Sequence, residues 1–252
     1  MFQQYNLIDG SLQCARYAFM PNKLRYCGGD KNSLLYQYTS NFYQDPGLSG
    51  LLKEFETLYP YLKLIAYKNK IVNPLDKRVV EAYWLGNSLL NNIKAKDLFN
   101  HMVDIQKLKK KLKKNIFEKV IGILPGGAFP HHSFHVINIP KRTGHYPVDH
   151  TIETMDQCRI GWGRVLLVKS NKVKVLTHLL EIKNNKIRLG KTIEKEYIWQ
   201  FGDKGFIKNI KKDDWVSLHW DFVCDKLSQI QLQNLKYYTQ LSINLANKQI
   251  NG

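Results

Sequence analysis

Cysteine pairs of the kind that build disulfide frameworks or zinc ribbons are missing from this sequence. Its four cysteines stand at positions 14, 27, 158 and 224, and no two of them have the Cys-x-x-Cys spacing. We therefore expect neither a disulfide framework nor a zinc ribbon. Cys14 and Cys224 have apolar neighbours and are predicted to be buried, whereas Cys27 and Cys158 stand beside glycines and polar residues, where a thiolate could be exposed.

Long apolar runs are also lacking. No stretch approaches the roughly 20 apolar residues that a membrane-spanning helix needs. The first residues do not form the basic and then apolar segments of a secretory signal. A nucleophile elbow and a phosphate-binding glycine loop are absent as well. We therefore expect a cytoplasmic protein with no membrane partner.

The sequence does carry a large excess of positive charge. It has 38 Lys and Arg against 21 Asp and Glu, which gives a formal net charge of +17. In the densest run, residues 107–114, Leu108 and Leu112 stand four apart. We interpret this run as the solvated face of a helix that buries its leucines; a phosphate-binding patch is the alternative.

The spacing of apolar residues changes near residue 125 and predicts an α+β protein. Up to that point apolar residues recur at helical intervals, as in residues 46–55 and 79–90, which predicts a helical domain over residues 1–125. Residues 126–157 are predicted to be a connecting segment, extended around Phe134 and a loop from residue 140 onward.

Residues 158–252 are predicted to form a small β-barrel followed by a C-terminal helix. Asn184-Asn185 makes a hairpin turn between two of the expected strands. Ser228 is the expected N-cap of the last helix. The predicted strands and the helix cover residues 163–168, 172–180, 186–189, 215–219 and 228–246.

Two segments of this C-terminal part carry the clearest functional signal. One begins at Cys158 and runs to Val165, and the other runs from Asp214 to Phe222. Each places one metal-binding side chain, Cys158 or His219, at the end of a predicted strand. A thiolate and an imidazole held together suit low-spin iron or another borderline-soft metal.

Three histidines of the connecting segment form a second candidate cluster. In an extended strand, His131 and His135 would share one face and could ligate one metal, joined by His132 only if the strand bends. The alternative is a group of packed polar histidines beside a loop. Cys27 lies in a Cys-Gly-Gly-Asp sequence that either exposes its thiol or is simply a structural turn.

Residues 158 to about 232 resemble the small hydrogenase-maturation chaperones of the HypC/HupF type. Those proteins begin with Cys-(Leu/Ile)-x-x-Pro-Gly-(Lys/Arg)-Val, and here Cys158 is followed in the same register by Gly163, Arg164 and Val165. Their second pattern, Gly-Asp-Tyr-Val-Leu-Val-His-x-Gly-Phe, is matched without a gap by residues 214–219, and Phe222 continues it.

The resemblance implies an OB-like barrel and a role in [NiFe]-hydrogenase maturation, as an assembly factor rather than as an enzyme. It implies that Cys158 and His219 hold iron as an Fe(CN)2(CO) fragment, which is delivered to the large-subunit precursor together with other maturation factors. We expect His131, His132, His135 and Cys27 to add metal ligands to the same site. The helical domain would add these ligands or a docking surface.

The chain departs from this family at three points. Cys158 is internal, whereas the family's cysteine becomes the first residue of the mature protein. Trp162 replaces the family's proline, and Trp220-Asp221 stands where the family has a small residue and a glycine. These departures leave open a barrel that no longer carries a metal.

The whole chain also resembles a family of bacterial proteins without an assigned function. The resemblance rests on Ala-Arg-Tyr-Ala-Phe at residues 15–19 and Val-Glu-Ala-Tyr-Trp at residues 80–84. It implies no mechanism.

Two other functions compete with the assembly factor. One is a basic OB-like module that stacks single-stranded nucleic acid on Trp162, Trp199, Trp215 and Trp220, although nucleic acid is not the partner we expect. The other is a metal-dependent enzyme that uses His131, His132 and His135.

Overall fold

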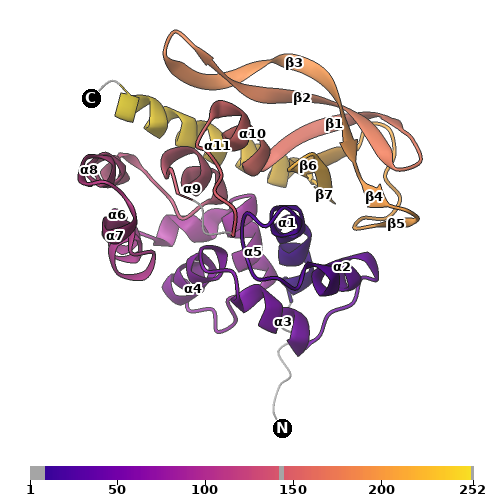
Figure 1. Ribbon diagram of the computed structural model, residues 1–252, viewed down its shortest axis with the longest axis horizontal. Coiled ribbons are helices and arrows are strands. Elements are labelled where there is room, and N and C mark those ends of the chain that lie inside the picture. The colour runs from indigo at the N-terminus through magenta and orange to yellow at the C-terminus, as the bar shows by residue number, and fades with distance from the viewer. Residues whose placement is uncertain (1–8, 142–144, 251–252) are drawn as a thin grey trace.

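The computed structural model describes residues 9–141 and 145–250. The protein is α+β, as predicted: helices fill the first half, and a five-stranded sheet and a long C-terminal helix follow (Figure 1). In these described ranges no helix is both long and apolar enough to cross a lipid bilayer. The helices are α1 (Ser11–Lys23), α2 (Asn32–Ser40), α3 (Pro46–Lys53), α4 (Leu58–Lys68), α5 (Lys77–Trp84), α6 (Ala95–Asn100), α7 (Leu108–Lys111), α8 (Lys114–Gly122), α9 (His132–Asn138), α10 (Ile152–Cys158) and α11 (Gln229–Ile250).

Helix α3 begins at Pro46, as its sequence predicts, because Asp45 caps it by accepting hydrogen bonds from the next two free amides. The basic run does not form one long helix. Lys107 adopts a left-handed backbone before α7, and Leu112 and Lys113 have extended backbones between α7 and α8, which begins at Lys114. Leu108 is buried while the lysines after it are exposed, which agrees with a solvated helix face.

The sheet consists of β1 (Gly161–Val168), β2 (Lys172–Lys183), β3 (Lys186–Ile198), β6 (Trp215–His219) and β7 (Phe222–Lys226). Its strand order is β1-β2-β3-β7-β6, and β6 also pairs with β1. Strands β3 and β7 are parallel and meet at a single residue pair, Ile198 and Phe222. A separate two-stranded hairpin joins β4 (Gln200–Phe201) to β5 (Lys204–Gly205).

Two tight turns in the sheet use left-handed backbone conformations. Asn184 and Asn185, the predicted hairpin turn, have φ of 53° and 56° and join β2 to β3. Trp220 and Asp221 have φ of 50° and 59° and join β6 to β7. Asn and Asp tolerate this conformation, whereas a bulky Trp adopts it only where the surrounding structure holds it.

The connecting segment is more helical than its sequence predicts. Residues 132–138 form α9 instead of an extended segment, because the ring nitrogen Nδ1 of His131 accepts a hydrogen bond from the Ser133 amide and caps the helix. The predicted loop after residue 140 contains α10, which Thr151 caps through Thr154. Helix α11 extends the predicted last helix at its C-terminal end, and Ser228 accepts from the Gln231 amide as its cap.

The hydrophobic core runs without interruption from the N-terminal helices to the sheet. Helix α1 packs against β6 and β7, and α9 packs against α11. Figure 1 places α9 and α10 between the sheet and the N-terminal helices. Side chains from both halves of the chain therefore meet in the layer that α9 and α10 form.

Candidate metal centre

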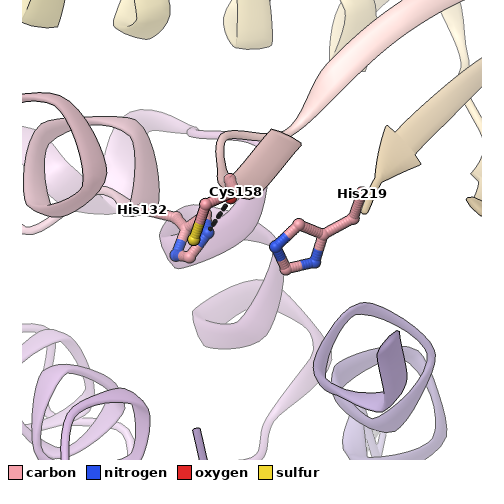
Figure 2. A group of neighbouring side chains, drawn as sticks. All are labelled: His132, Cys158 and His219. Carbon is pink, nitrogen blue, oxygen red and sulfur yellow. Dashed lines mark hydrogen bonds between the residues drawn. The ribbon is translucent and has the colours of Figure 1, made fainter. Parts of the chain in front are cut away.

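Three potential metal ligands from different elements meet in this layer. His132 is the first residue of α9, Cys158 is the last residue of α10 and His219 is the last residue of β6. One ligand atom from each of them lies within 4.8 Å of the other two, and all three side chains are buried. In Figure 2 the His219 ring approaches from the end of its strand and turns one nitrogen toward Cys158 and His132.

Backbone contacts fix the approach of Cys158 to His219. Helix α10 ends at Cys158, and Arg159 continues with an extended backbone that leads into β1. The amide of Trp220, in the turn after β6, donates a hydrogen bond of 2.8 Å to the carbonyl of Gln157. This bond joins the end of α10 to the end of β6. Cys158 and His219, which adjoin the two bonded residues in the chain, therefore lie close together.

The hydrogen bonds of the two histidines define their protonation. A carbonyl oxygen only accepts, so Nδ1 of His219 carries the proton that it donates to the Tyr17 carbonyl at 2.7 Å. Its Nε2 keeps a lone pair, is buried, and has no hydrogen-bond partner among the described residues. Metal-binding histidines commonly donate their second N–H to a backbone carbonyl in this way.

His132 is held on both sides. Its Nε2 donates to the carbonyl of Cys158 at 2.7 Å, and its Nδ1 accepts from the Tyr83 hydroxyl at 3.2 Å. A metal bound to His132 would replace one of these two hydrogen bonds. The lone pair on Nε2 of His219 is thus directly available to a metal. His132 offers a lone pair only after one of its two hydrogen bonds is broken.

Burial keeps both rings uncharged. It lowers the pKa of His219 to about 4, although the hydrogen bond to the Tyr17 carbonyl and the nearby backbone of Cys158 oppose this shift. Burial, and then the neighbouring His219, hold the pKa of His132 well below its usual value. Neutral imidazole is the form that binds metals, so no proton has to leave these rings at neutral pH.

The cluster borders a largely apolar cavity of about 50 Å³. Tyr83 and Trp84 of α5 form part of its wall, and the Trp84 ring lies 4.5 Å from that of His132 and 5.8 Å from that of His219. A single water occupies about 10–15 Å³ on this measure, so the space suffices for an ion and small ligands.

Two further predicted ligands, Cys27 and His135, line the same cavity. His135 lies one helical turn after His132 on α9, and its Nδ1 is 3.1 Å from the Tyr61 hydroxyl. Cys27 is half-buried in the loop after α1. The structure therefore gathers five of the six predicted ligand residues around one cavity and brings three of them together.

His131 lies apart from this group. Its ring stacks on Tyr238 of α11 at 5.2 Å, and its Nδ1 is used to cap α9. The expected pairing of His131 with His135 on one face assumed a strand. In a helix, residues three apart share a face, and His132 takes that place beside His135.

The sequence pattern gave no direct sign of the groups that orient these ligands. Tyr17 and Tyr83 supply the hydrogen bonds to His219 and His132, and Trp84 packs against both rings. All three lie in the short segments at residues 15–19 and 80–84 that mark the whole-chain resemblance. Those segments are therefore the signal by which these residues could have been found.

The donor set is one sulfur and two imidazole nitrogens. Metal–ligand bonds of about 2.0–2.3 Å place the ligands of a tetrahedral ion about 3.5 Å apart, so movements of about 1 Å close the cluster on a metal. Such a set suits zinc, copper(I) or low-spin iron, and it leaves at least one coordination position for another ligand.

Comparison with known protein families gives a match over nearly the whole chain. The family described as "Family of unknown function (DUF6390)" matches residues 6–252 of the chain. No curated protein and no solved structure matches the chain significantly. The family match agrees with the resemblance to proteins of unassigned function, and it does not support the resemblance to the HypC/HupF type.

Proposed function

The chain belongs to DUF6390, a family of unknown function, and we propose that it is a metal-binding assembly factor. In this proposal His132, Cys158 and His219 hold one iron fragment of the Fe(CN)2(CO) kind. The protein passes this cargo to the large-subunit precursor of a [NiFe]-hydrogenase or to a related metalloenzyme, together with other maturation factors.

The observation that carries the proposal is the meeting of a thiol and two neutral imidazoles at one buried cavity. Cys158 and His219 are also the two residues that the HypC/HupF resemblance implies as ligands. The left-handed backbone at Asp221 adds support, because it is the conformation for which the family's glycine at this position is best suited.

The donor set fits the cargo in number and in kind. Low-spin iron is six-coordinate, and three protein ligands leave three positions for two cyanides and one carbon monoxide. A soft thiolate suits iron that already carries strong-field ligands. A cargo held by few protein bonds can be released, and the mainly apolar cavity wall would keep water from the fragment.

We also infer that the five main strands form an OB-like barrel. Support comes from the pairing of β6 with both β1 and β7 and from the parallel meeting of β3 with β7. An OB barrel is a five-stranded Greek-key barrel of this size.

The competing functions have less support from the geometry. Of the four tryptophans proposed to stack bases, Trp162 and Trp220 are buried, and Lys236 lies over the ring of Trp215. An enzyme that uses His131, His132 and His135 together would need His131 in the cavity, whereas it lies against Tyr238.

Infrared spectroscopy on anaerobically produced protein tests the proposal. The chain is co-expressed with the maturation proteins that make the iron fragment and is purified without oxygen. We expect about one iron per chain, with cyanide and carbon monoxide stretches, as the six-coordinate count requires. Both signals should be lost in Cys158→Ala and in His219→Ala.

The matched control is His131→Asn, which changes a buried histidine that is next to His132 in the chain but outside the cluster, and which keeps a good helix cap. It should retain the iron and its stretches. The proposal fails if the wild-type protein shows no such stretches, or if Cys158→Ala shows them at equal strength.

A further inference from the structure

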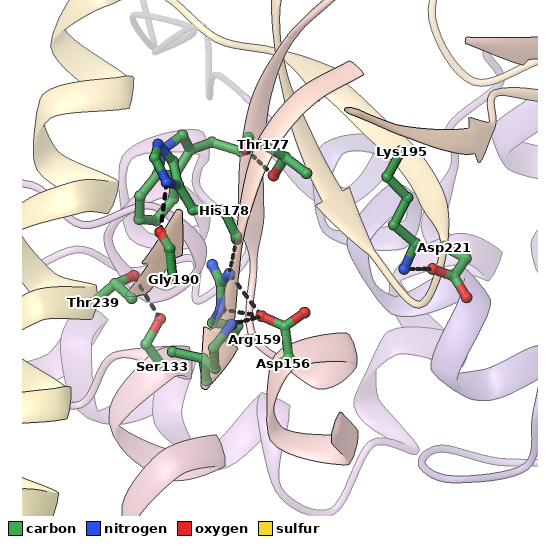
Figure 3. A network of polar contacts seen from close by, with 11 residues as sticks. Ser133, Asp156, Arg159, Thr177, His178, Gly190, Lys195, Asp221 and Thr239 are labelled. Carbon is green, nitrogen blue, oxygen red and sulfur yellow. Dashed lines mark hydrogen bonds and ion pairs between the residues drawn. The ribbon is translucent and has the colours of Figure 1, made fainter. Parts of the chain in front are cut away.

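A second, polar pocket lies beside the candidate metal centre and is built around Arg159. Figure 3 shows this arginine surrounded by polar groups of α10 and the sheet. Only 1% of Arg159 is exposed, although arginine is among the residues least often fully buried. The pocket is lined by residues of α10, β1, β2, β3 and the turn after β6, among them Gly161, Thr177, Lys195 and Tyr197.

Part of the guanidinium is fully used within the protein. Nε and Nη2 of Arg159 donate to one carboxylate oxygen of Asp156 at 3.0 and 2.7 Å, and Nη2 also donates to the His178 carbonyl at 2.7 Å. The same Asp156 oxygen accepts from the Leu180 amide. These bonds fix the plane of the guanidinium, which lies over the Trp162 ring.

The other terminal nitrogen, Nη1, is buried and has no hydrogen-bond partner among the described residues. It lies on the side of the pocket where Gly161 has no side chain: a Cβ at this glycine would be 3.7 Å from Nη1. A buried charged donor without a partner costs free energy, and an anionic acceptor is its strongest partner.

The second cation of the pocket stands nearer to solvent. The Lys195 ammonium pairs with Asp221 at 2.7 Å and lies over the Tyr197 ring at 5.2 Å. Its side chain is about one-third exposed, so it can exchange Asp221 for another acceptor. His178 is less suited to attract an anion, because its Nδ1 donates to the Gly190 carbonyl.

We propose that this pocket binds a carboxylate, with one oxygen on Nη1 of Arg159 and the other side of the group facing Lys195. The cavity volume is about 20 Å³, little more than one water on this measure, so it has room only for the head of a small acid and excludes a bulky one. Two carboxylates of the chain already neutralise the two cations, so the ligand binds weakly unless Lys195 leaves Asp221. The site is independent of the proposed metal function, although His219 lines both cavities.

Acetate titration followed by ¹H–¹⁵N NMR tests this site. The signals to follow are the Nε–H of Arg159 and the amide of Gly161. We expect saturable shifts with acetate and none with chloride at the same ionic strength. A benzoate titration distinguishes a small acid from a bulky one, and it should give no saturable shift.

Two variants and a control make the test specific. Gly161→Ala adds only contacts of ordinary van der Waals length and should fold, yet it covers Nη1 and should abolish the acetate shifts. Lys195→Gln should weaken acetate binding by about tenfold through the loss of one charged donor. Lys174→Gln removes a half-buried lysine that pairs with Glu194 on the same sheet and should leave binding unchanged.

The proposal is overturned if the wild-type shifts are linear or absent, if chloride gives the same shifts, or if Gly161→Ala binds acetate as tightly as the wild type. Metal content plays no part in this measurement. A failure here therefore leaves the metal centre untouched, and the reverse also holds.

Discussion

At the scale of single residues, burial keeps the histidines uncharged and so leaves their rings in the form that binds metals. It lowers the pKa of His131 to about 3 and those of His101 and His219 to about 4. A neutral ring offers a lone pair, and the partner of its N–H decides which nitrogen presents it. In His219 the Tyr17 carbonyl makes this choice and leaves Nε2 toward the cavity.

The same effect predicts acid sensitivity, which His101 tests away from the candidate ligands. Its Nε2 accepts a hydrogen bond from Nε2 of Gln106, whose amide also donates to the Thr57 carbonyl, so a proton on His101 Nε2 would break this contact. The folded pKa is below the unfolded value of about 6.5, so the folded state binds fewer protons. The stability that this group contributes is present above pH 6.5 and is lost as the pH falls toward 4.

Urea unfolding of the wild type and of His101→Gln at pH 7, 6, 5 and 4.5 measures this contribution. We expect the wild type to lose on the order of 2 kcal/mol more than the variant over this range. Parallel loss in the two proteins would contradict the assignment.

At the scale of elements, short polar caps decide where the helices begin. Helix α5, which carries Tyr83 and Trp84, follows its N-cap Asp76, whose side chain accepts from the Arg78 amide and from the Arg78 guanidinium. The Arg78 guanidinium holds the pKa of Asp76 below its usual value. This cap fixes the position of the helix that borders the cavity.

Two replacements of Asp76 distinguish the contribution of the helix cap to stability from that of the ion pair with Arg78. Asp76→Ala should lower the free energy of unfolding by about 1–2 kcal/mol because it removes both. Asp76→Asn keeps an oxygen that accepts from the Arg78 amide and should lose less than half as much. Thermal and urea unfolding give the comparison, and equal losses in the two variants would show that the cap contributes little.

The elements also show what the sequence could predict. Alternating apolar residues correctly placed β1, the start of β2, β6 and the turn at Asn184-Asn185. Helix α9 was missed because its cap is His131, an unusual capping residue, and because buried residues on all its faces leave no helical periodicity. Helix α10 was missed because only Ile152 and Met155 mark its apolar side and Thr154 stands where a Glu or Gln is expected.

The candidate site, too, could be predicted from the sequence only in part. Cys158 and His219 could be chosen because each stands at the end of a predicted strand within a recognisable segment. The addition of His132 and the separation of His131 depend on one helical turn in α9, which no local pattern indicated. The contact between His219 and Tyr17 joins residues 202 positions apart, and local sequence patterns cannot predict such a contact.

At the scale of the whole molecule, the site exists only where the helical half meets the sheet. Helices α1 and α5 supply the Tyr17 carbonyl and the Tyr83 hydroxyl, while α10 and β6 supply Cys158 and His219. The C-terminal helix ties these halves together: the Tyr238 hydroxyl donates to the Asn87 carbonyl, just after α5. Gly86 lies directly beneath the Tyr238 ring, with φ of 89°.

Gly86→Ala tests this long-range packing. A Cβ there would lie 2.0 Å from a ring carbon of Tyr238, so either the ring or α5 must move. We expect a loss of about 3 kcal/mol in the free energy of unfolding. Gly127→Ala is the matched control, because Gly127 has φ of 96° and no atom within 4 Å of its added Cβ; it should lose only about 1 kcal/mol. Equal losses would mean that backbone conformation alone accounts for the effect.

Cobalt(II) titration of the purified protein without oxygen tests the convergence of His132, Cys158 and His219 most directly. Cobalt reports its own ligands, because a thiolate ligand gives an intense sulfur-to-metal charge-transfer band. The account predicts saturation near one cobalt per chain, loss of that band in Cys158→Ser, and weaker binding by at least tenfold in His132→Ala and His219→Ala. Cys224→Ala, a buried thiol elsewhere in the core, should bind like the wild type. No saturable binding, or a charge-transfer band that persists in Cys158→Ser, would contradict the account.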